Sequence, residues 1–201
     1  MQSVRIKTIK LTSLAILFAL IVALQAALTF IWPGVVPITL ALPLILLGAI
    51  VFGTWAGAFL GASFGFVVFL SGATSTAFVS SLVFQVSPLG LFLATVGRGA
   101  AAGIAGALVY KALRRKNEYL AVASAAVILP IVNTAIFLGV MVLFFQGVLL
   151  SPLWAENPPN TFFGLLSAWA GVNFVIELVL NVLLTAYIVR IKKVIEDREE
   201  I

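Results

Sequence analysis

The chain has 201 residues, of which 63% are hydrophobic and only 9% charged, with a formal net charge of +5 and a mean hydropathy of +1.22. Soluble domains carry about a quarter charged residues, so this composition excludes an ordinary soluble fold and indicates an integral membrane protein. Because the sequence contains no cysteine and no histidine, it lacks disulfides, thiol chemistry and histidine ligands, and we expect no metal site, no cofactor and no enzyme activity.

Apolar runs bounded by proline, glycine and charged residues predict six membrane-spanning helices in a single domain over residues 1–201. We place the spans at residues 8–32, 38–52, 54–71, 88–112, 119–147 and 162–189. The second and third spans leave two arrangements open. They form either two short helices that turn at residues 52–54 or one long bent helix. The predicted fold class is an all-α integral membrane bundle of six transmembrane helices.

Basic residues indicate the orientation of this bundle, because lysine and arginine collect on the cytoplasmic side of membrane helices. All but one of the 12 lie near the start of the first predicted span, around the connection between the fourth and fifth, or after the sixth. Both termini are therefore predicted to be cytoplasmic. This topology explains the basic excess, so we expect the lipid bilayer and no nucleic acid as a partner. A cleavable signal peptide is the alternative for the first span, whose apolar stretch is longer than a typical signal core.

Two charged residues lie deep in predicted spans, where each costs at least about 2.5 kcal/mol unless it has a partner or a use. Arg98 is about ten residues into the fourth span and Glu177 is at a similar depth in the sixth. One interpretation is a buried salt bridge between them. The other is that Arg98 meets an anionic ligand such as a carboxylate, which a guanidinium binds through two hydrogen bonds.

Neutral polar residues surround these charges. Trp169, Asn173, Glu177 and Asn181 recur every four residues on one helix face, and Asn133 lies midway along the fifth span. Any one asparagine can be a hydrogen-bonding contact between helices. Together with Arg98, however, Asn133 and Asn173 predict a small polar pocket on the last three helices. Residues 72–87, which include Gln85, are too polar for a span and are interpreted as a lid.

Small residues form two stripes with a spacing of four. Ala15, Ala19, Ala23 and Ala27 lie in the first span, and four glycines at positions 53, 57, 61 and 65 lie at the third. Such stripes let helix backbones approach closely. We interpret the glycines as internal packing. The alanines serve either internal packing or contact with another membrane protein. The sequence contains no phosphate-binding Gly-x-x-x-x-Gly-Lys-Ser/Thr motif, so this chain is not expected to hydrolyse ATP itself.

This layout, with the Ala15, Ala19, Ala23 pattern, the polar segment after the third helix and the polar pocket on the last three, resembles the substrate-binding S components of energy-coupling factor (ECF) vitamin transporters. The resemblance covers the whole chain. It implies a bacterial cytoplasmic membrane protein that captures a vitamin at the outer face. It also implies docking through the alanines onto a transmembrane T subunit that carries two ATPase subunits.

Within that family, the polar pocket looks most like that of the pantothenate-specific members. The substrate-binding residues that we predict are Arg98, Asn133, Asn173, Trp169, Glu177 and Gln85. Folate, riboflavin and cobalamin stay open as alternative vitamins. Outside the family, the alternatives are a stand-alone transporter coupled to protons through Glu177, a membrane enzyme, and a scaffold without a ligand.

Overall fold

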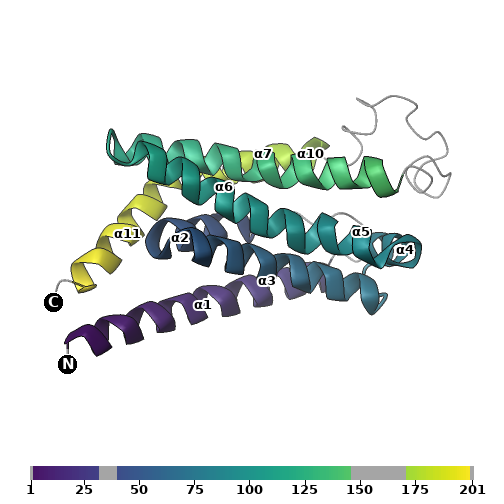
Figure 1. Ribbon diagram of the computed structural model, residues 1–201, viewed down its shortest axis with the longest axis horizontal. Coiled ribbons are helices and arrows are strands. Elements are labelled where there is room, and N and C mark those ends of the chain that lie inside the picture. The colour runs from purple at the N-terminus through teal and green to yellow at the C-terminus, as the bar shows by residue number, and fades with distance from the viewer. Residues whose placement is uncertain (1, 32–39, 146–170, 200–201) are drawn as a thin grey trace.

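The computed structural model describes residues 2–31, 40–145 and 171–199, and every element in these ranges is helical (Figure 1). The elements are α1 (Gln2–Ile31), α2 (Leu42–Phe52), α3 (Thr54–Ala73), α4 (Phe78–Val86), α5 (Pro88–Phe92), the π-helix η1 (Leu93–Gly97), α6 (Arg98–Leu113), α7 (Glu118–Phe144), α10 (Gly171–Leu183) and α11 (Thr185–Glu199). The predicted all-α class is therefore confirmed for the described residues.

Four stretches are long and apolar enough to cross a membrane: Thr8–Thr29, Thr54–Ala73, Pro88–Leu113 and Glu118–Phe144. A fifth is reached if α10 and α11, which bend by 47° at Leu184, form one broken span. With 11 residues, α2 is about 16 Å long, roughly half of the hydrocarbon core. The chain is thus a multi-pass membrane protein, and the predicted total of six spans stays a prediction.

The choice between two helices and one bent helix at residues 38–71 is resolved by Gly53. Its φ of 90° and ψ of −176° end α2 and start α3 on the next residue. A side chain at this φ would be strained, which is why glycine suits the break. The interpretation as two helices is confirmed, although α2 begins at Leu42 and is shorter than expected.

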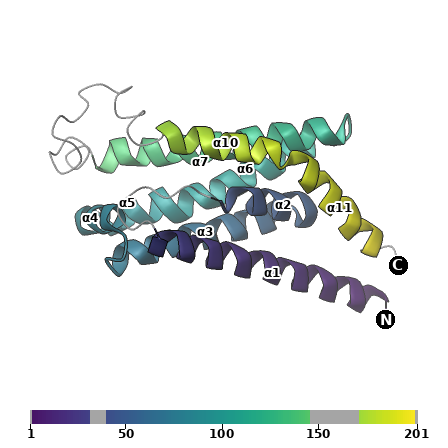
Figure 2. The same cartoon turned by 180° about the vertical axis from the view of Figure 1, so that it is seen from behind.

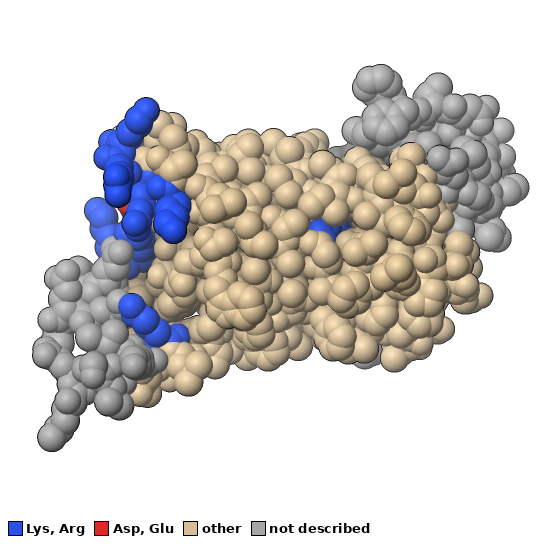
Figure 3. Space-filling model, in the orientation of Figure 1, with Lys and Arg blue, Asp and Glu red and all other residues tan. Residues whose placement is uncertain are grey.

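The long helices run side by side, with α6 between α3 and α7 and with α10 alongside α7 (Figures 1 and 2). Both chain ends and the connection between α6 and α7 lie at one end of the bundle, and α4 and α5 lie at the other. Lysine and arginine side chains gather at the end that holds the termini (Figure 3). This grouping agrees with the predicted topology, whereas the cytoplasmic assignment of that end stays a prediction.

Helices α3 and α6 cross with their backbones in close contact. A Cβ atom added at Gly57 would lie 2.7 Å from the Gly103 carbonyl oxygen, and Gly61 and Gly65 meet the backbones of Gly99 and Thr95 in the same way. Only glycine allows two helix backbones to approach this closely. The prediction that the glycine stripe serves internal packing is confirmed for these three positions.

Two apolar clusters fill the bundle. The larger joins α1, α2, α3, α6, α7 and α11 around fully buried leucines such as Leu46, Leu60 and Leu129. The smaller lies toward the α4 end and contains Val83, Leu91, Met141 and Phe145. It ties α4, at the end of the predicted lid segment, to α5 and α7. The polar side chains described next lie on the helices that these two clusters hold together.

Candidate functional site

Arg98 is positioned by an unusual turn. Ser87 caps the start of α5 by accepting a hydrogen bond from the Gly90 N–H at 3.0 Å, and Pro88 occupies the first helical position. The chain then passes through η1, where the Arg98 N–H donates to the Leu93 carbonyl five residues earlier. Single π-helical turns inside α-helices are frequent at functional sites. This turn places Arg98 at the start of α6, in the middle of the Pro88–Leu113 span.

The Arg98 side chain is buried, with 9% of its surface exposed. Its guanidinium carbon lies 4.7 Å from the ring centre of Phe137 and 5.8 Å from that of Phe64. The buried Nε has no hydrogen-bond acceptor among the described residues. A guanidinium is a donor only, so an unused buried N–H is costly unless a ligand or water accepts it.

Glu177 on α10 is also buried, at 6% exposure. The choice between a buried salt bridge with Glu177 and an Arg98 that meets an anionic ligand therefore stays a prediction.

Asn133 lies at the level of Arg98 on the neighbouring helix. The antiparallel helices α6 and α7 are joined by a short turn. Arg98 lies 15 residues before Leu113, the last residue of α6, and Asn133 lies 15 residues after Glu118, the first residue of α7. Asn133 is 2% exposed, and its Oδ1 has no donor among the described residues. A buried arginine and a buried amide thus lie on adjacent helices, and each has a polar atom without a partner among the described residues. The pocket that they are predicted to form with Asn173 stays a prediction.

The remaining residues that the sequence predicts for the site differ in where they lie and in whether the structure describes them. Asn173 lies in the first turn of α10, but its side chain is outside the described part, and Trp169 lies outside the described residues altogether. Gln85 on α4 is exposed and not buried with Arg98. Asn181 is fully buried, and its Nδ2 donates to the Glu177 carbonyl at 2.8 Å. Asn181 Oδ1 has no donor within the described ranges.

Gln25 is a further candidate ligand contact that was not among the residues predicted from the sequence. This α1 residue is 1% exposed, and its Oε1 lacks a hydrogen-bond donor among the residues described. The signal was present in the spacing, because Leu17, Ile21, Gln25 and Thr29 recur every four residues and all are buried. A polar residue on the buried face of a membrane helix is expensive and marks a candidate contact.

The alanine stripe lies on the opposite side of α1. Ala15, Ala19, Ala23 and Ala27 are all exposed, as are the neighbouring Ile16 and Leu20. The stripe therefore does not pack against the rest of the described chain, and contact with another membrane protein stays a prediction. An exposed row of small side chains on a membrane helix can receive another helix closely.

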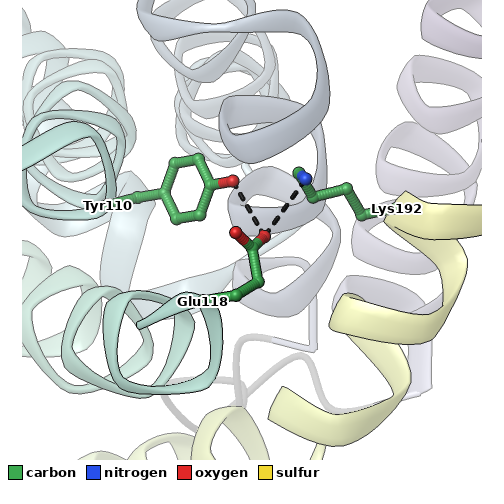
Figure 4. A network of polar contacts seen from close by, with 3 residues as sticks. All are labelled: Tyr110, Glu118 and Lys192. Carbon is green, nitrogen blue, oxygen red and sulfur yellow. Dashed lines mark hydrogen bonds and ion pairs between the residues drawn. The ribbon is translucent and has the colours of Figure 1, made fainter. Parts of the chain in front are cut away.

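A second polar group lies at the end of the bundle that holds the termini (Figure 4). The Tyr110 hydroxyl donates to Glu118 Oε1 at 2.9 Å, and Lys192 Nζ is 3.1 Å from the same oxygen. These three residues come from α6, α7 and α11. The network fixes the last helix against the α6–α7 pair, far from Arg98 along the bundle.

Two comparisons with known proteins give consistent results. The family model for the substrate-specific component of ECF transporters matches residues 9–189. The chain is also 33% identical over 189 residues to the pantothenic acid transporter PanT of Lactococcus lactis subsp. cremoris strain MG1363, an alignment that covers 88% of this chain and 89% of that protein. Members of this family are transport subunits and not enzymes. The chain belongs to the family of substrate-specific S components of ECF transporters.

Proposed function

We propose that this chain is a pantothenate-binding S component in a bacterial cytoplasmic membrane, which captures the vitamin and delivers it through a T subunit and two ATPase subunits. The similarity to a pantothenic acid transporter over most of both chains supports this vitamin before folate, riboflavin or cobalamin. The family supports the partner subunits. Pantothenate carries a carboxylate, an amide and hydroxyl groups, and the buried polar atoms match these groups in kind.

The observation that carries the proposal is the buried guanidinium of Arg98 with an unused Nε–H, together with the unused Oδ1 of Asn133 on the adjacent helix α7. A carboxylate accepts two parallel hydrogen bonds from a guanidinium, which is the strongest pairing that these groups can form. The amide oxygen of Asn133 accepts a hydrogen bond from a ligand hydroxyl or N–H. Asn173 and Trp169 are proposed to complete the site from α10 and the residues before it, and Glu177 to adjust the charge around Arg98.

Arg98→Met tests this assignment, because methionine keeps much of the buried volume and removes the charge and all donors. Loss of charge-assisted hydrogen bonds worth about 1.5–3 kcal/mol each raises the Kd for pantothenate by roughly tenfold to several hundredfold. The measurement is calorimetric titration of the purified chain. Arg115→Met, at an exposed position, is the matched control and leaves the Kd unchanged. An unchanged Kd in Arg98→Met means that the site is elsewhere.

Titration with folate, riboflavin and cobalamin completes the same experiment. Tighter binding of one of these vitamins than of pantothenate would replace the proposed substrate. Vesicles that contain this chain alone are expected to show no uptake driven by a proton gradient. Uptake by the chain alone would favour a stand-alone transporter with Glu177 as the proton carrier instead.

The exposed alanines are the proposed contact with the T subunit. Ala19→Trp adds bulk only at that face, so it is expected to leave pantothenate affinity unchanged and to abolish uptake by cells that also make the T and ATPase subunits. Ala135→Trp changes an alanine that is exposed on α7, and it serves as the control that spares both properties. If Ala19→Trp reduced binding and uptake equally, the stripe would not be a docking surface.

A further inference from the structure

Two phenylalanine rings contact the Arg98 guanidinium through their faces. The guanidinium carbon lies over the Phe137 ring at 4.7 Å from its centre and over the Phe64 ring at 5.8 Å. Phe64 comes from α3 and is 1% exposed, and Phe137 comes from α7 one helical turn from Asn133. Because α3 and α7 both pack along α6, the helices that flank Arg98 each supply one ring.

These contacts have an electrostatic consequence. The face of an aromatic ring carries partial negative charge and attracts a cation within about 6 Å of its centre, most strongly where water is excluded. Both distances fall inside that limit. The rings therefore offset part of the cost of burying Arg98 without accepting any of its hydrogen bonds.

This arrangement differs from the usual way of burying an arginine. A carboxylate partner would occupy the N–H groups along the edge of the guanidinium plane. A ring face approaches the plane itself and takes none of the N–H groups, and the buried Nε–H at the edge has no acceptor among the described residues.

We propose that Phe137, together with Phe64, is a positioning residue that holds the face of the Arg98 guanidinium and leaves its edge for a ligand carboxylate. This inference rests on the proposed function, since it names the residues that prepare the anion-binding group of the same site. It assigns to Phe137 an influence on ligand affinity that acts through Arg98.

Fluorinated phenylalanines at position 137 test the inference in the full-length chain. One, two and three ring fluorines progressively reduce the negative charge of the ring face with little change in shape. Cation–π contacts of this kind correspond to about a two- to thirtyfold change in an equilibrium constant, so the Kd for pantothenate is expected to rise stepwise by up to that factor. The same substitutions at Phe144, which is 43% exposed on α7, are the matched control and leave the Kd unchanged.

Thermal unfolding of the ligand-free protein separates this inference from the proposed function. We expect the melting temperature to fall with each fluorine at position 137 in the presence of Arg98, and to stay constant in an Arg98→Met background. If the unsubstituted protein did not bind pantothenate but kept this Arg98-dependent fall, the proposed function would fail and the aromatic contact would stand. A Kd that does not respond to fluorination in a pantothenate-binding protein overturns the inference. An equal fall in the Arg98→Met background also overturns it, because the ring would then be an apolar packing element only.

Discussion

Adding one methyl group at the α3–α6 crossing tests how the bundle positions Arg98. In Gly57→Ala the new Cβ atom would lie 2.7 Å from both the Gly103 carbonyl oxygen and the Ala49 side chain, whereas ordinary contacts begin at 3.4 Å. The helices must therefore separate by about 0.7 Å on each side. Overpacking of this kind costs about 1–3 kcal/mol. Gly61→Ala places its methyl group still closer to the backbone of Gly99, so its cost is expected to be larger.

For a chain of this length, 1 kcal/mol corresponds to about 2–4 °C in melting temperature, so Gly57→Ala is expected to melt roughly 2–12 °C lower. Gly61→Ala should melt lower still and also lose ligand affinity, because Gly99 follows Arg98 directly in α6. The measurement is thermal unfolding in detergent combined with pantothenate titration.

Two glycines supply the controls for this series. A methyl group at Gly139 would meet nothing within 4 Å, and one at Gly97 would meet only Leu93 at an ordinary 3.7 Å. Both alanine variants should melt at or above the original temperature, since alanine favours helix formation by up to about 1 kcal/mol. If Gly97→Ala and Gly61→Ala destabilised equally, distance from the α3–α6 backbone contact would not be the cause.

Two further predictions concern polar side chains. Asn133→Leu removes a buried oxygen that has no partner among the described residues and costs about 1–3 kcal/mol to bury. The ligand-free variant should therefore melt at a higher temperature, while its Kd for pantothenate rises. Lower stability together with unchanged affinity would contradict a ligand role. Glu118→Gln weakens the contacts to Tyr110 and Lys192, and a loss of about 1 kcal/mol should speed amide hydrogen exchange in α11 roughly fivefold. Lys193→Gln, at an exposed position, should not change that exchange, and an equal effect there would indicate that charge alone holds the helix.

The features that the sequence predicted correctly are those with a repeating pattern. The spacing of four at Gly57, Gly61 and Gly65 predicts a flat helix surface, and the structure places another helix backbone against it. The burial of Arg98 follows equally from local context, because a charge within an apolar run must lie inside the bundle. Such predictions need only the helical period and the cost of a polar group in lipid.

Features that depend on the pairing of distant helices were not predictable. The aromatic contacts of Arg98 join residues 34 and 39 positions apart in the chain, and no local pattern indicates that Phe64 and Phe137 contact the same side chain. The π-helical turn before Arg98 likewise depends on backbone hydrogen bonding, which hydropathy cannot register. The bend at Leu184 also escaped prediction, because the sequence next to it contains no proline or glycine.

Two rows of residues with the same four-residue spacing form two different surfaces of α1. Ala19 and Ala23 are exposed, while Ile21 and Gln25, two residues further along in each case, are buried. A shift of two residues turns a helix by about 200°, so the two rows lie on opposite sides of α1. Bulk added at Ala19 therefore points away from the interior. Since helices in lipid associate through close packing and not through the hydrophobic effect, a row of exposed alanines permits a contact that forms and separates without disturbing the buried polar residues on the other side.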